Sequence, residues 1–288
     1  MSGGYTVLIY LVYIVNRELR GNMSIKNNKI AGVVVSLALF VAAPLHAETP
    51  EEKGYNIFNE AEKRDEGFVD NESDMLMILM NKQEATSERE MSVKGLEGKG
   101  EEGDMSLMVF LSPKDQKGTA LLTHQHKDRD DDQWLYLPAL KRVKKIASSK
   151  KSGPFMGSEF SFEDIGGQSI EDYTYKYLRD ENYEGQDCFV VESYPVDKNS
   201  GYTRIVTWVD KEHYRTLKAE FYDRKKSHLK TLTATGFKQY EGKFWRPAEM
   251  LMVNHQTGRS TVLKQQNMKF KTGLSESDFN KNSLKRAR

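Results

Sequence analysis

Apolar and polar residues alternate in short runs through most of the chain after residue 86, and this pattern predicts a mainly β fold. The runs are separated by pairs that favour tight turns, among them Glu184-Gly185, Glu241-Gly242 and Thr257-Gly258. Short strands at regular spacing, joined by tight turns, predict one curved antiparallel meander of about 10–11 strands.

The run from Met75 to Met80 departs from this alternation because every position in it is apolar. A strand with one face in water alternates, so we expect this strand to be covered on both faces. Methionine is flexible enough to line a surface that adapts to a ligand, but it also fills ordinary gaps in a core. We expect a helix near one face of this strand and a core or a cavity at the other.

One helix is predicted ahead of the strands. Pro50-Glu51-Glu52 is typical of a helix N-terminus, because proline fits the first turn and acidic side chains interact favourably with the helix dipole. An apolar stripe follows, formed by Tyr55, Ile57, Phe58 and Ala61. The pattern therefore predicts a helix that ends at about Lys63.

The rest of the chain is organised around the stretch from Gln133 to Ile165. It begins with a short strand that Pro138 ends, since proline cannot donate to a β-ladder. A basic strand or loop follows, which holds Lys141, Arg142, Lys144, Lys145, Lys150 and Lys151. The next segment is bounded by glycine and proline and carries Phe155, Met156, Phe160 and Phe162. We predict that this apolar loop is a flap over an apolar space.

The N-terminal residues have the features of a targeting sequence. Lys26 and Lys29 form a basic region, residues 30–41 an apolar region, and Leu45-His46-Ala47 a cleavage site. We interpret residues 1–22 as a mis-called extension, with a genuine N-terminal anchor as the alternative, and residues 23–47 as a signal peptide. Residues 48–288 are expected to form a single exported, periplasmic domain.

Charge and cysteine content narrow the class of protein. The chain holds 43 basic and 42 acidic residues, and this near-neutral balance argues against a nucleic-acid partner, which requires a net basic footprint. Cys188 is the only cysteine, so no disulfide forms within the chain. It lies in an apolar run, where we expect it to be buried on a strand.

Catalytic motifs are absent from the sequence, and we expect no enzymatic activity and no cofactor. There is no Gly-x-Ser-x-Gly elbow and no glycine-rich phosphate loop. His124 and His126 share one face of a predicted strand and lie close to several acidic residues. A metal-dependent hydrolase built on these histidines is one hypothesis, although their spacing enforces no ligand geometry.

Aromatic and methionine residues are the strongest positive signal. Trp134 and Tyr136 share one strand face, and Trp208, Phe221, Phe244 and Trp245 lie on or beside later strands. Such residues either fill a closed barrel or line a cavity in a wider one, and the pattern does not decide between the two. The candidates for an apolar ligand site are Met75, Met77, Leu79, Met108, Phe110, Trp134, Tyr136, Phe155, Met156, Phe160 and Phe162.

The chain resembles the LolA-like family of outer-membrane lipoprotein-sorting proteins. The resemblance is carried by the signal peptide, the N-terminal helix, the strand at residues 133–138 and, most specifically, the loop at residues 153–164. It implies a periplasmic, half-open antiparallel β-barrel closed by helices, whose apolar cavity carries lipid tails between membranes. The best-known carrier of the family has an arginine on an early barrel strand that helps to control lid opening, and the comparable strand here, Met105–Leu111, has none.

Three functional hypotheses follow. The favoured one is a periplasmic carrier that binds the acyl chains of a lipoprotein or lipid and shuttles it toward the outer membrane, with an inner-membrane transporter and an outer-membrane acceptor as partners. The second is an accessory subunit of a membrane exporter that binds protein rather than lipid. The third is the metal-dependent hydrolase. Bound lipid would support the carrier, co-purification with a transporter would support the exporter subunit, and a stoichiometric metal would support the hydrolase.

Overall fold

The computed structural model describes residues 47–99, 102–167 and 169–286. The expected extension at residues 1–22 and the expected signal peptide, up to His46, lie outside the described residues. Within the described residues, no helix is both long and apolar enough to span a bilayer.

The described residues form fifteen strands, of which thirteen make one antiparallel sheet. The sheet order is β6-β5-β4-β3-β2-β1-β15-β14-β11-β10-β9-β8-β7, and β12 and β13 form a separate hairpin. The strands are β1 (Asp70–Met80), β2 (Thr86–Leu96), β3 (Glu102–Phe110), β4 (Ala120–His126), β5 (Asp132–Leu137), β6 (Arg142–Ile146), β7 (Tyr173–Tyr183), β8 (Gln186–Pro195), β9 (Tyr202–Asp210), β10 (Thr216–Asp223), β11 (His228–Thr235), β12 (Lys238–Tyr240), β13 (Phe244–Arg246), β14 (Glu249–Asn254) and β15 (Arg259–Phe270). The fifteen strands exceed the predicted 10–11, in part because the β12–β13 hairpin and the basic run also form strands.

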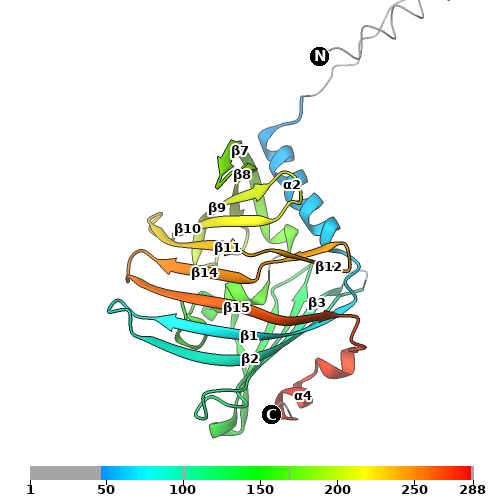
Figure 1. Cartoon of the computed structure of the whole chain (residues 1–288), viewed down its shortest axis with the longest axis vertical. Helices are drawn as coiled ribbons and strands as arrows, with labels where there is room; N and C mark the ends of the chain where they lie inside the picture. Colours follow the sequence, from blue (N-terminus) through cyan, green and yellow to red (C-terminus); the bar gives the residue numbers. More distant parts are fainter. Residues whose placement is uncertain (1–46, 100–101, 168, 287–288) are drawn as a thin grey trace, which may run out of the picture. The chain divides into compact units, whose positions relative to one another are not determined.

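The sheet is curled but open, which agrees with a half-open barrel (Figure 1). Its edges are β6 and β7, although these two strands follow one another in the chain. The connection between them, residues 147–172, therefore has to pass from one edge to the other. Residues 152–166 of this connection, here called the plug segment, pack on the inner face of the sheet.

Three helices accompany the sheet in the described part of the chain. They are α2 (Pro50–Asp65), α3 (Phe162–Gly166) and α4 (Lys281–Arg286). Short 3₁₀ turns are η1 (Pro138–Leu140), η2 (Ser148–Lys150), η3 (Phe155–Gly157), η4 (Ile170–Asp172) and η5 (Glu276–Asp278). The predicted N-terminal helix is confirmed as α2. Thr49 and Glu52 form a capping box at its N-terminus, which satisfies backbone donors that have no partner within the helix.

The inner face of the sheet carries two apolar clusters. One holds the methionines of β1 together with Phe110, Phe221 and the apolar side chains of the plug segment. The other lies under α2, where Ile57 packs against Tyr175 of β7, Val191 of β8 and Val209 of β9.

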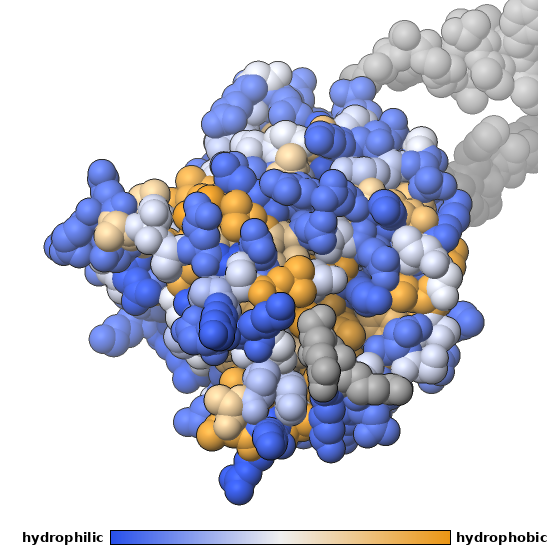
Figure 2. Space-filling model, turned by 60° about the horizontal axis from the view of Figure 1, so that its bottom comes forward, coloured by the Kyte–Doolittle hydropathy of each residue, from blue (hydrophilic) through white to orange (hydrophobic). Residues whose placement is uncertain are grey.

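The outer face is covered in part by the C-terminal tail. Phe279 and Leu284 are fully buried there against Trp134 and Leu122. Figure 2 brings the end of the molecule that holds α4 forward and shows mostly hydrophilic side chains with apolar patches between them.

Strand β1 is covered less completely than its sequence predicts. Met75, Met77 and Leu79 are buried on the inner face, whereas Leu76 and Ile78 on the outer face are only partly buried. Leu76 lies between Glu90 and Lys264 on the neighbouring strands. Long charged side chains cover apolar surface with their aliphatic stems, so no second layer of structure is needed here. Cys188 is buried on β8, as expected.

Candidate functional site

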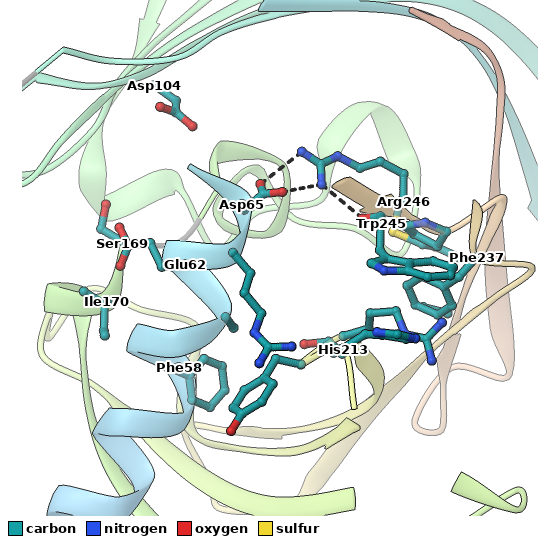
Figure 3. A pocket seen from close by; sticks show the side chains of 18 of the residues that line it. Phe58, Glu62, Asp65, Asp104, Ser169, Ile170, His213, Phe237, Trp245 and Arg246 are labelled. Atoms are coloured by element: carbon teal, nitrogen blue, oxygen red, sulfur yellow. Dashed lines mark hydrogen bonds and ion pairs between the residues drawn. The ribbon is translucent and has the colours of Figure 1, made fainter. Parts of the chain in front are cut away.

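A cavity of about 560 Å³ lies between α2, the inner face of the sheet and the β12–β13 hairpin. This volume falls within the range of roughly 300–1,000 Å³ that is usual for ligand pockets. Figure 3 shows α2 beside the cavity, with Asp65 directed toward Arg246 and Glu62 directed the other way, toward Ser169. His213, Phe237, Trp245 and Arg246 line the opposite side.

The position of α2 depends on a close approach at Gly54. A Cβ atom at this position would lie 2.8 Å from the backbone nitrogen of Tyr177 and 2.9 Å from that of Lys176. Glycine therefore lets the helix rest directly on β7. Phe58 packs on Tyr175 with their ring centroids 4.7 Å apart, and Ala61, one turn further along, reaches the cavity.

Aromatic rings and arginines form one wall of the cavity. His213 stacks on Trp245 with ring centroids 4.6 Å apart. The guanidinium of Arg215 lies 4.9 Å from the Phe237 ring and 4.8 Å from the Trp245 ring. Such cation–π contacts hold the rings in place and leave an extended, largely apolar surface.

The rim of the cavity is tied by polar contacts between α2 and the β12–β13 hairpin. Arg246 donates two hydrogen bonds to the Asp65 carboxylate, at 2.5 and 3.0 Å. Lys243 donates to the backbone oxygen of Glu66. On the other side of the hairpin, Phe244 stacks on Phe270 of β15 at 5.2 Å. These contacts place the hairpin across the end of α2.

Acidic groups lie on the side of the cavity away from Trp245. Burial raises the pKa of Glu62, and the nearby Glu171 carboxylate adds to this shift. Burial also raises the pKa of Asp104, although its carboxylate accepts a hydrogen bond from the Gly98 backbone at 2.9 Å. The cavity is therefore amphiphilic, with aromatic rings on one side and ionisable groups at its margins.

The structure separates the predicted site residues into two groups. Met75, Met77, Leu79, Met108, Phe110, Phe155 and Phe160 are buried together on the inner face, with Met156 and Phe162 packed against them. Trp134 and Tyr136 lie on the outer face, because alternate residues of β5 point to opposite sides of the sheet. None of the eleven lines the cavity under α2. Their contact with a ligand stays a prediction.

The plug segment fills the inner face instead of covering an empty space, and the predicted flap is not confirmed. Phe155 is fully buried and lies 5.8 Å from Phe110 and 5.5 Å from Phe162, measured between ring centroids. The hydroxyl of Tyr202 donates to Asp164 Oδ1 at 2.8 Å. The plug segment therefore belongs to the core.

Charged side chains from several strands hold the plug segment in place. Lys230 of β11 is 3% exposed, and its Nζ lies 2.5 Å from Asp164 Oδ2 and 3.0 Å from the Glu159 backbone oxygen. Arg89 of β2 donates to the backbone oxygen of Met156. Strand β3 lacks an arginine, as the sequence indicates, but an arginine on the adjacent strand contacts this segment.

The two histidines considered as metal ligands have separate partners. Nε2 of His124 lies 2.7 Å from the backbone oxygen of Phe279. Nε2 of His126 lies 3.2 Å from Asp132 Oδ2 and 3.1 Å from Arg129 Nη2. Across the described residues, no three histidine, cysteine or acidic side chains come together in a metal-binding arrangement.

Sequence reasoning missed most of the cavity lining. In the sequence, Trp245 is one aromatic residue among several, and Phe58 and Ala61 belong to the apolar stripe of the predicted helix. His213 and Arg215 lie in a turn between β9 and β10, where no motif marks them. Their convergence depends on the curl of the sheet, which brings this turn opposite the β12–β13 hairpin.

An open, curled antiparallel sheet that packs on a helix and encloses a cavity defines a half-open β-barrel protein. A family model described only as "Uncharacterized protein" matches residues 102–286, more than half of the chain. A crystallised domain from Vibrio parahaemolyticus, described as an outer membrane lipoprotein-sorting protein domain, is 56% identical with a TM-score of 0.80, and the match covers 82% of this chain and 100% of that one. The chain therefore belongs to the same family as this outer membrane lipoprotein-sorting protein domain.

Two further solved structures agree with this assignment. A DUF1329 family protein from Desulfovibrio piger is 30% identical with a TM-score of 0.77, and the match covers 82% of this chain and 99% of that one. A LolA superfamily protein from Nitrosomonas europaea, 22% identical with a TM-score of 0.65 and matched over 80% of this chain and 98% of that one, shares the fold. A comparison with curated proteins found no match.

Proposed function

We propose that this protein is a non-enzymatic periplasmic carrier, which encloses acyl chains of a lipoprotein or lipid in the cavity under α2 and delivers them toward the outer membrane. The observation that carries the proposal is the cavity of about 560 Å³ between α2 and the sheet, in a chain that belongs to a lipoprotein-sorting family. Burial of apolar surface favours the binding of acyl chains by about 25 cal/mol per Å². The aromatic wall of the cavity supplies such a surface.

The cavity also suggests how cargo is released. A carrier has to release its ligand, so its open and closed states differ by a modest free energy. Few polar contacts join α2 to the β12–β13 hairpin, and they lie at the rim of the cavity, where Arg246 forms an ion pair with Asp65. Separation of these two elements would widen the entrance without disturbing the buried inner-face cluster. The methionines of β1 would reach a ligand only if the plug segment also moved.

The test begins with gentle purification from the periplasm, native mass spectrometry and lipid extraction. A lipid or acylated peptide bound at near one-to-one supports the carrier function and identifies the cargo class. A fluorescent fatty-acid probe then locates the site. Ala61→Trp, on the cavity side of α2, should weaken probe binding by at least about tenfold, because the indole would occupy the space that the ligand needs.

The matched control is Lys63→Trp, which places the same side chain on an exposed position of the same helix. It should bind the probe like the unmodified protein, and circular dichroism should show both variants folded. Equal binding by the two variants would exclude the cavity as the site. A protein that carries no lipid and binds no probe would overturn the carrier function in favour of an exporter subunit that binds protein.

A further inference from the structure

We propose that the β5–β6 end of the sheet is a docking surface for anionic membrane lipids. This surface, here called the basic edge, consists of Leu140, Lys141, Arg142, Lys144, Lys145 and Lys150. The proposal goes beyond the carrier function and does not depend on what the cavity binds. It is carried by the charge, exposure and position of these residues.

Most of the positive charge on the basic edge is not neutralised. Lys145 pairs with Asp132, but Lys141, Arg142, Lys144 and Lys150 make no ion pair with any residue that the structure describes, and all four are exposed. The segment from residue 139 to 152 contains no acidic residue. Exposed cations that no ion pair neutralises attract an anionic surface over about a Debye length.

The C-terminal helix extends the same positive surface. Helix α4 packs against β4, β5 and β6, so Lys281 and Lys285 lie close to the basic edge. Nζ of Lys281 lies 4.6 Å from the centroid of the Trp134 ring. Two segments that are far apart in the sequence therefore contribute cations to one end of the sheet.

Protection of a sheet edge does not account for this arrangement. Edge strands often carry lysine, which discourages pairing with other chains. The opposite edge, β7, has both signs of charge, with Lys176 and Arg179 beside Asp180 and Glu181. Mixed charges are sufficient to protect an edge, so the exclusively positive charge of β6 points to a negatively charged partner.

The exposed leucine at the hairpin tip favours a membrane over a protein as this partner. The side chain of Leu140 is 63% exposed at the end of the 3₁₀ turn after β5. Lys141 follows it in the left-handed conformation, with φ of 50°, and reverses the chain. An apolar tip flanked by cations can enter the headgroup region while the lysines contact phosphates. A single leucine and a few cations give weak, reversible binding, which suits repeated docking.

The test uses residues 48–288 and vesicles. Residues 47–288 form a compact unit by themselves, and the related Vibrio domain of this extent was crystallised. Co-sedimentation should show binding to vesicles that contain phosphatidylglycerol, weak binding to pure phosphatidylcholine, and loss of binding as salt rises. Lys141→Glu with Lys144→Glu should weaken binding by at least about tenfold, since each cation near an anionic surface contributes a factor of about five.

Matched control variants exist for the lysines of the basic edge and for its exposed leucine. Lys225→Glu with Lys226→Glu reverses two charges at the β10–β11 turn, where Lys226 also has a positive φ of 63°. Leu140→Ser has a counterpart in Val196→Ser, since both side chains are 63% exposed. Loss of vesicle binding in the basic-edge variants, with normal binding in the controls, supports the proposal. Equal losses in the controls would show a general charge effect, and no binding to anionic vesicles would leave an acidic protein as the partner; either result overturns it.

Discussion

Single residues decide whether the inner face of this sheet is a cavity or a core. Phe155 is fully buried among aromatic side chains from the plug segment and β3. Lys230 and Asp164 form an ion pair in the same region, and both are nearly excluded from solvent. Removal of one partner from such a pair leaves a buried charge, which is strongly destabilising. The plug segment is therefore held by apolar contacts and by charge together.

Replacement of Phe155 tests this interpretation. Phe155→Ala should lower the free energy of unfolding by about 3–5 kcal/mol, because it leaves a cavity in a packed core. Leu140→Ala, at an exposed position, should change it by less than about 0.5 kcal/mol. Urea unfolding measures both. A stable Phe155→Ala variant with altered ligand binding would instead make the segment a flap, as its sequence suggests.

At the scale of elements, the cavity exists because α2 and the plug segment occupy different parts of the inner face. Helix α2 rests on β7, β8 and β9, while the plug segment packs with side chains of β1, β3 and β10 and reaches Tyr202 at the start of β9. The β12–β13 hairpin is inserted in the chain between β11 and β14, which pair directly with each other, and it extends to the end of α2. The space left between these three elements is the proposed ligand site.

The contact between α2 and β7 makes Gly54 sensitive to substitution. Alanine favours a helix over glycine by about 1 kcal/mol. In Gly54→Ala, however, the new methyl group would meet the backbone of Lys176 and Tyr177 within 3 Å. The helix has to move outward, and we expect a net loss of about 1–3 kcal/mol. Thermal unfolding should show a lower Tm for Gly54→Ala than for the exposed control Lys63→Ala. A raised Tm would contradict the close approach.

At the scale of the whole molecule, carboxylates with shifted pKa values make stability depend on pH. Burial raises the pKa of Asp131 from 3.8 to about 7, and the charge of Asp172 adds to this shift, although the backbone of His126 donates to the carboxylate. The folded protein therefore binds this proton more tightly than the unfolded chain. The stabilisation is present at low pH and is lost as pH rises from about 4 to about 7.

Asp131→Asn isolates this contribution from those of other carboxylates. Asparagine resembles the neutral acid, so the variant should lack the part of the pH dependence that is due to Asp131. Between pH 5 and pH 8, the unmodified protein should lose about 2–3 kcal/mol more stability than the variant. Chemical unfolding at several pH values measures the difference. Asp128→Asn, at an exposed position nearby, should follow the unmodified protein; a similar curve for Asp131→Asn would contradict the prediction.

The sequence by itself determined the local elements of this protein. The capping residues of α2 and its apolar stripe predicted the helix within two residues of its observed end. Alternation and turn pairs predicted an antiparallel sheet, because these signals act between neighbours in the chain. The loop at residues 153–164 and the strand before it also carried enough specific residues to indicate the family.

The tertiary structure alone decided which surfaces face the cavity. The sequence predicts that Phe155 and Met156 belong to a flap, whereas the structure places them in or against the core. An apolar loop has the same composition whether it covers a space or fills it. Trp134 and Met75 are equally apolar, yet the register of the sheet places them on opposite faces. The cavity lining comes from segments distant in sequence, such as Phe58 and Trp245. Their meeting depends on sheet curl and strand order, which no local pattern encodes.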